Sequence, residues 1–155
     1  MTFSRPNLLI LAGLGSVAMM AGALSFQYIG DMPPCKLCYW QRYPHYAAMV
    51  IALIALLIPG RFWPLLGAGA ALTTAAIGIY HTGVERKLWD GPSSCSSNNV
   101  TGLNPTELLD QIMNAPIVRC DEAPWEMLTL SMASWNAIAS FALALIWLAA
   151  AKNRI

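Results

Sequence analysis

The sequence predicts an all-α membrane protein, a bundle of four transmembrane helices with a short amphipathic helix in the second outward loop. Of its 155 residues, 57% are apolar and only 11% are charged, whereas soluble domains contain about 25% charged residues. Four apolar runs have, or approach, the roughly 20 helical residues that cross a hydrocarbon core. A buried helix of a soluble protein explains one such run but not four, so residues 1–155 are expected to form a single integral membrane domain.

The predicted spans cover residues 7–29, 43–58, 62–81 and 131–151. The first run carries no charged residue. It also fits a secretory signal, because Arg5 precedes it and Ala21-Gly22-Ala23 matches the small-residue pattern of a cleavage site. Apolar residues continue from Ala23 to Ile29, which favours a helix that is retained.

Residue types within the spans predict how the helices pack. Gly67, Ala71 and Ala75 recur at four-residue spacing in the third span, and small residues let helix backbones approach closely in lipid. Trp63 and Trp147 are expected at the inner membrane interface, where aromatic side chains concentrate.

Charge predicts which side of the membrane each loop faces. Four basic residues and no acidic residue occupy the two termini and the short connection between the second and third spans: Arg5, Arg61, Lys152 and Arg154. The outward loops, residues 30–42 and 82–130, hold all eight acidic residues. Because Lys and Arg concentrate on the cytoplasmic side, both termini are expected in the cytoplasm. A net charge of +1 lacks the strong positive charge that is typical of nucleic-acid-binding proteins.

The four cysteines then lie outside, or at the outer membrane boundary. Cys35 and Cys38 form a CxxC motif in PPCKLCYWQR, and Cys95 and Cys120 belong to the long second loop. Disulfides persist in oxidising compartments, so this side favours disulfide chemistry, and the turn-rich GPSSCSSNNVTG predicts an accessible Cys95. A four-cysteine zinc site is an alternative, although zinc ribbons usually repeat CxxC. A purely structural Cys95–Cys120 bridge, contributing roughly 3 kcal/mol, is another.

Arg42 follows the CxxC motif at a spacing that matters only if this segment is helical. In a helix over residues 38–49, Arg42 lies one turn after Cys38, and its permanent positive charge favours the Cys38 thiolate. Pro44 limits this expectation, because proline prefers the first helical turn and would then leave both residues ahead of the helix. An interfacial arginine with its charge in the headgroup region is the alternative.

His45 and His81 are the only histidines, and both are predicted at the level of the dithiol. An imidazole can donate a hydrogen bond or move a proton near neutral pH, so both are candidate site residues. The alternative for each is a polar residue with structural partners alone.

The stretch LNPTELLDQIMNAP predicts a short helix in the second loop. Asn104 is a favourable N-cap, Pro105 suits the first helical position and Glu107 completes a capping box. Its apolar face fits either the membrane surface or the rest of the loop.

Together these features resemble the bacterial disulfide bond formation protein B family, DsbB. The resemblance rests on four spans with both ends inside and on CKLC followed by Tyr39-Trp40-Gln41-Arg42. It also rests on the later pair Cys95 and Cys120, and on His81 within IYHTG. The vitamin K epoxide reductase type shares four helices and paired cysteines, but there the loop pair precedes the CxxC motif. A non-catalytic membrane scaffold with structural disulfides is an alternative of another class.

The resemblance implies a thiol:quinone oxidoreductase of the bacterial inner membrane, with its cysteine loops in the periplasm. A DsbA-like thioredoxin-fold partner would give two electrons to the Cys95–Cys120 pair, with Cys95 forming the mixed disulfide. Cys120 would pass them to Cys35, and Cys38 would reduce ubiquinone or menaquinone. The expected quinone-binding residues are Arg42, His81 and His45, and no metal is expected.

Overall fold

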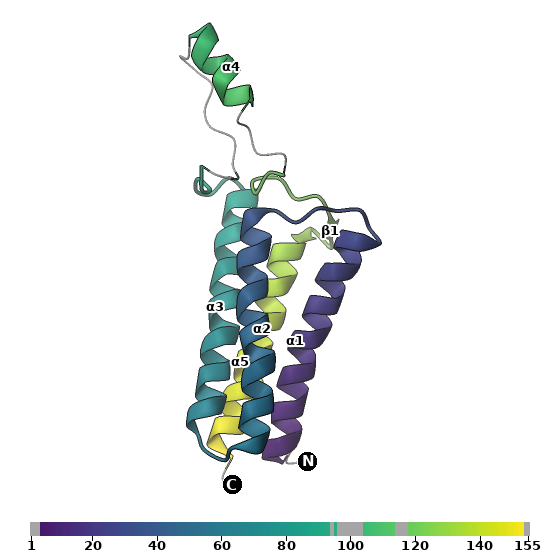
Figure 1. Ribbon diagram of the computed structural model, residues 1–155, viewed down its shortest axis with the longest axis vertical. Coiled ribbons are helices and arrows are strands. Elements are labelled where there is room, and N and C mark those ends of the chain that lie inside the picture. The colour runs from purple at the N-terminus through teal and green to yellow at the C-terminus, as the bar shows by residue number, and fades with distance from the viewer. Residues whose placement is uncertain (1–3, 94, 96–103, 114–117, 154–155) are drawn as a thin grey trace.

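The computed structural model describes residues 4–93, 95, 104–113 and 118–153. Four long helices run side by side as a bundle (Figure 1): α1 (Arg5–Tyr28), α2 (Lys36–Leu57), α3 (Phe62–Glu85) and α5 (Met132–Lys152). The start of α1 and the end of α5 lie at the same end of this bundle. The α3–α5 connection contains the short helix α4 (Pro105–Met113) and an antiparallel pair, β1 (Glu126–Met127) and β2 (Leu130–Ser131).

The all-helical architecture is confirmed, and three of the helices have the length and composition of membrane spans. In the described part of the chain, α1, α3 and α5 are long and apolar enough to cross a membrane. The α2 helix has 22 residues but includes Lys36 and Arg42, so its crossing stays a prediction. A helix also forms at Pro105–Met113, whereas the proposed location of its apolar face on the membrane stays a prediction.

The start of α2 differs from the predicted span over residues 43–58. The helix begins at Lys36 because the Cys35 side chain caps it, accepting a hydrogen bond from the Cys38 backbone N–H at 3.2 Å. Pro44 lies inside the helix, where it removes only the N–H that would pair with the Trp40 carbonyl. Cys38 and Arg42 therefore belong to one continuous helix, one turn apart.

Close packing of α3 on α5 is organised around Trp147. This side chain is fully buried inside the bundle, whereas its expected level at the inner membrane interface stays a prediction. A Cβ atom at Gly67 would lie only 2.5 Å from the Trp147 ring, which explains why a glycine stands there. The bare backbone of α3 leaves the space that the indole fills, and burial of so large an aromatic ring stabilises the α3–α5 contact.

We therefore predict that Gly67→Ala destabilises the protein by about 1–3 kcal/mol, the usual effect of overpacking a tight core. Thermal unfolding in detergent measures this effect as a lowered midpoint. Gly69→Ala, on the same helix, is the matched control, because a Cβ there meets no described atom within 4 Å. Equal midpoints for the two variants would contradict the packing described here.

Candidate redox site

A cavity of about 310 Å³ opens at the end of the bundle where α2 begins and α3 ends. Met19, Met20, Ala23 and Phe26 of α1 contribute an apolar wall. The opposite side carries polar groups from the other three long helices, namely Cys38, Gln41, Arg42, His45, His81, Glu85 and Asn136. The cavity thus combines an oily surface with a small set of convergent polar groups, as small-molecule sites do.

Cys35 and Cys38 are free thiols whose Sγ atoms lie 2.7 Å apart. The hydrogen bond with Cys38 raises the pKa of Cys35, and burial raises it further. The same hydrogen bond lowers the pKa of Cys38, and the positive charge of Arg42 adds to this although burial opposes it. The proton of the pair therefore stays on the buried Cys35, while Cys38, in the first turn of α2, is the sulfur that favours the thiolate.

Cys95 and Cys120 are joined in a disulfide, with Cα atoms 5.2 Å apart. Their bond leaves them unavailable as zinc ligands, so the four-cysteine alternative does not match this arrangement. Cys95 is only 1% exposed, which corrects the expectation of an accessible sulfur. The disulfide and Cys35 belong to one apolar cluster with Leu37 and Val84. The oxidised pair and the reduced pair therefore share one apolar cluster.

Ion pairs hold the segment around Cys120 against the end of α3. Lys87 Nζ lies 2.7 Å from the Asp121 carboxylate and also donates to the Asp121 carbonyl. Arg119 contacts the same carboxylate at 2.8 Å. Because Asp121 directly follows Cys120, these contacts fix the disulfide beside the dithiol.

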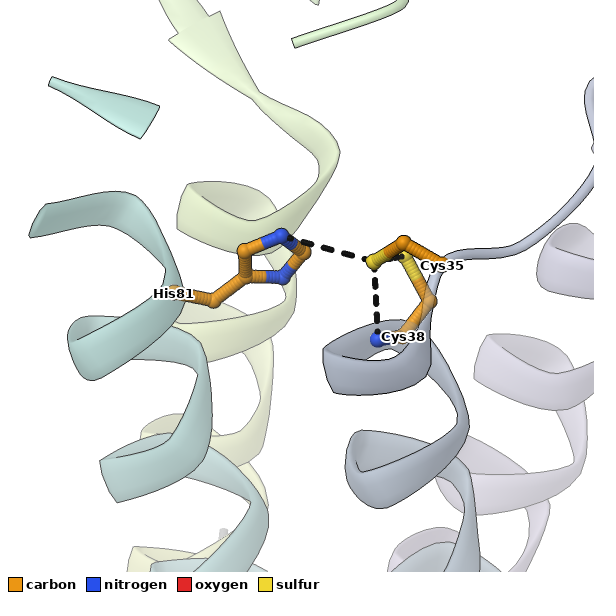
Figure 2. Close-up of side chains that lie close together, drawn as sticks. All are labelled: Cys35, Cys38 and His81. Carbon is orange, nitrogen blue, oxygen red and sulfur yellow. Dashed lines mark hydrogen bonds between the residues drawn. The ribbon is translucent and has the colours of Figure 1, made fainter. Parts of the chain in front are cut away.

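His81 lies on α3, one turn before its end at Glu85. Figure 2 shows its ring facing the two cysteines, with Nε2 3.6 Å from the Cys35 Sγ. The Glu85 carboxylate lies 3.8 Å from the same nitrogen. The imidazole is thus in contact with the CxxC dithiol.

His45 lies one turn further into the bundle than Gln41 and is buried. Its Nε2 is 3.0 Å from the Asn136 Oδ1 and 3.3 Å from the Ser140 hydroxyl. The structure therefore places His45 in the cavity wall, and links it to the dithiol through the amides of Asn136 and Gln41.

Arg42 is anchored to α1. Its guanidinium donates to the Gln27 side chain at 2.6 Å and to the Ala23 carbonyl at 3.3 Å, both on α1. The charge also lies over the Tyr39 ring, 5.3 Å from its centroid. These contacts keep a positive charge at the cavity, next to Cys38 along α2.

Three site residues were missed from the sequence: Gln41, Glu85 and Asn136. Glu85 follows His81 by four residues, a spacing that puts both on one helix face. Asn136 is a lone amide inside an apolar run, and such residues mark interhelical contacts or sites. For Gln41, the sequence offers no feature that indicates a site residue beyond its position beside Arg42.

A dithiol that shares an apolar cluster with a disulfide, at the end of an apolar helix bundle, is typical of a membrane protein of thiol–disulfide exchange. The family described as "Disulfide bond formation protein DsbB" matches residues 5–150. The chain therefore belongs to the DsbB family, and it is a disulfide-forming oxidoreductase, a multi-pass protein of the inner membrane.

Individual relatives agree with this assignment. A disulfide bond formation protein B of a Shewanella species (strain W3-18-1) is 27% identical over 151 residues, covering 94% of this chain and 85% of the relative. Another, from Shewanella denitrificans, is 30% identical over 148 residues, covering 89% and 82%. A third, from Dechloromonas aromatica, is 28% identical, covering 81% and 79%. No solved structure matches the chain.

The environment of the two thiols predicts unequal reactivity. In reduced protein, Cys38 should be alkylated by iodoacetamide at a lower pH than an ordinary cysteine, because its pKa is lowered. Cys35→Ala should move the Cys38 profile to higher pH by the largest amount, since the Cys35 hydrogen bond is the main cause. Arg42→Gln should move it less, and Arg42→Lys least. Mass spectrometry of alkylated peptides measures each profile, and a Cys38 profile unaffected by Cys35→Ala would contradict this account.

Proposed function

We propose that the protein is a thiol:quinone oxidoreductase that reoxidises a DsbA-like thioredoxin-fold protein in the periplasm and passes the electrons to a membrane quinone. The observation that carries the proposal is the shared cluster of the Cys95–Cys120 disulfide and the Cys35 thiol, beside a cavity that Cys38 lines. Placement in one cluster supports exchange between the two pairs, and the cavity would give the second pair access to an electron acceptor.

The proposed topology is a single membrane domain over residues 1–155 with α2 as the fourth span, both termini in the cytoplasm and both cysteine loops outside. Contacts at the terminal end of the bundle support it, since Arg5 donates to the Gly60 carbonyl at 2.6 Å and Arg61 to the Ala151 carbonyl at 3.0 Å. Basic side chains thus gather at one end, as expected for the cytoplasmic side. Arg154 lies outside the described residues.

The proposed relay has two exchanges that conserve electrons and protons. A partner thiolate attacks Cys95, and Cys120 leaves as a thiolate. The second partner thiol then displaces Cys95, so that the partner is oxidised and the Cys95–Cys120 pair is reduced. Cys120 next attacks Cys35 of a Cys35–Cys38 disulfide, Cys38 leaves, and Cys95 resolves the mixed bond. The structure has the oxidised loop pair and the reduced CxxC pair that this second exchange leaves behind.

The residues around the cavity suit a quinone. Its apolar wall on α1 matches an oily ring and tail, Arg42 is the donor that would hold a ring oxygen, and His81 and His45 line the polar part of the same cavity. When bound, a quinone supplies an acceptor for two electrons and two protons. The protein's own part is to present the Cys38 thiolate, to keep the Arg42 charge beside it and to exclude water with α1.

We predict quinone-dependent oxidation of a reduced thioredoxin-fold partner by the purified protein in detergent. Cys38→Ser should abolish turnover. Cys95→Ser should abolish oxidation of the partner but retain quinone reduction with dithiothreitol, because the CxxC pair is intact. Absorbance of ubiquinone and menaquinone measures both reactions. Full turnover by Cys38→Ser would overturn the assignment, and no turnover by the wild-type protein with either quinone would favour a structural scaffold.

Arg42→Ala should raise the KM for quinone about tenfold, the loss expected for a hydrogen bond to a charged group. Arg86→Ala is the matched control, because Arg86 is an exposed arginine that binds the Thr129 carbonyl in the loop. Steady-state kinetics at saturating partner measures the effect. An unchanged KM in Arg42→Ala would remove Arg42 from the quinone site.

A further inference from the structure

We propose that Gln41 and Asn136 are positioning residues that hold His81 in the tautomer protonated on Nε2, so that its N–H is presented to the Cys35 sulfur. The proposal deepens the proposed function and rests on it for the effect on turnover, whereas the tautomer itself can be measured separately. It follows from a line of buried hydrogen bonds that joins α2, α3 and α5.

The contact between Gln41 and His81 decides the tautomer. Gln41 Nε2 lies 2.8 Å from His81 Nδ1 and 3.3 Å from the Leu37 carbonyl. An amide nitrogen only donates, so Nδ1 must accept and carries no proton. The single proton of a neutral imidazole is then on Nε2. Exchanging the amide oxygen and nitrogen of Gln41 would set its oxygen against the Leu37 carbonyl, which fixes the orientation.

Asn136 holds Gln41 in this orientation. Its Nδ2 donates to the Gln41 Oε1 at 2.8 Å and to the Thr74 hydroxyl at 3.1 Å. Its Oδ1 accepts from His45 Nε2 at 3.0 Å, and the Thr74 hydroxyl donates to the Gln41 carbonyl at 2.9 Å. Every donor in the line points from His45 towards His81. Reversing either amide would place like groups together in an apolar interior, where an unpaired polar group is costly.

The groups around His81 Nε2 can accept a hydrogen bond from a protonated Nε2. They are the Cys35 sulfur at 3.6 Å, drawn in Figure 2, and the Glu85 carboxylate at 3.8 Å. In this tautomer His81 donates to Cys35 and cannot act as the base that removes its proton. Its role is to stabilise negative charge on the Cys35 sulfur whenever an exchange step creates a thiolate there.

The other tautomer would have a different chemical property. The sulfurs of Cys35 and Cys38 and a nitrogen of His81 lie within 4.8 Å of one another, and two thiolates with one imidazole are a known zinc ligand set. Zinc requires a lone pair on the nitrogen that faces the sulfurs, which the Nε2-protonated form lacks. The hydrogen bonds of Gln41 and Asn136 therefore also disfavour the binding of a thiophilic metal at the reduced site.

Nitrogen-15 NMR of histidine-labelled protein reads the tautomer, and with two histidines in the chain His81→Gln assigns the signals. We expect His81 protonated on Nε2 in the reduced wild-type protein. Gln41→Glu should reverse this, because a carboxylate accepts from Nδ1–H. Wild-type His81 protonated on Nδ1, or a Gln41→Glu variant with the wild-type pattern, would overturn the proposal.

Thr74→Val and Thr73→Val form a matched pair on α3 that tests the line without touching His81. Thr74 belongs to the line, whereas the exposed Thr73 donates to the Gly69 carbonyl of its own helix. Only Thr74→Val should mix the two tautomers and slow exchange between the cysteine pairs, by about tenfold, with the KM for quinone unchanged. Equal spectra and rates for both variants would contradict a positioning role.

Zinc alone, added to reduced protein and titrated against a chelator, gives an independent reading. Gln41→Glu should bind zinc at least tenfold more tightly than the wild-type protein, and Cys35→Ser should abolish this gain. Equal zinc affinity in wild-type and Gln41→Glu proteins would count against the tautomer. An intact tautomer in a protein that fails to reduce quinone would overturn the proposed function and leave this inference standing.

Discussion

The hydrogen bond from the Cys38 backbone to the Cys35 sulfur is the interaction on which the site depends. It starts α2 at Lys36, ahead of Pro44, and so fixes the phase of everything that follows on this helix. Cys38 falls in the first turn, Arg42 one turn later towards α1, and Gln41 towards His81. A reactive sulfur thus also serves as the helix cap, so the redox chemistry and the geometry of the helix start are coupled.

A second constraint is that leaving a polar group unpaired inside an apolar bundle costs free energy. Gln41, His45, Thr74 and Asn136 satisfy this requirement within one line of hydrogen bonds across three helices. Such a line has few alternative arrangements of its protons, because each amide has a fixed donor side and a fixed acceptor side. The apolar surroundings that make membrane insertion possible therefore also give the site its rigidity.

Much of the fold followed from the sequence because bilayer thickness sets helix length, and the CxxC spacing identified the dithiol. The start of α2 did not follow from the sequence, because the Cys35 cap begins the helix upstream of Pro44, whereas proline usually occupies a first turn. The burial of Trp147 against α3 was not predicted, because only the structure reveals the space left by Gly67. The roles of Gln41 and Asn136 depend on contacts between helices distant in sequence, which no local pattern encodes.

The burial of Cys95 has a consequence for selectivity among reductants. A sulfur that is 1% exposed reacts slowly with small thiols in solution, since attack requires a straight approach along the disulfide bond. A protein that first binds the surrounding loop can use its binding free energy to uncover that path. Burial of Cys95 thus favours exchange with a bound protein over exchange with free thiols, as the proposed function requires.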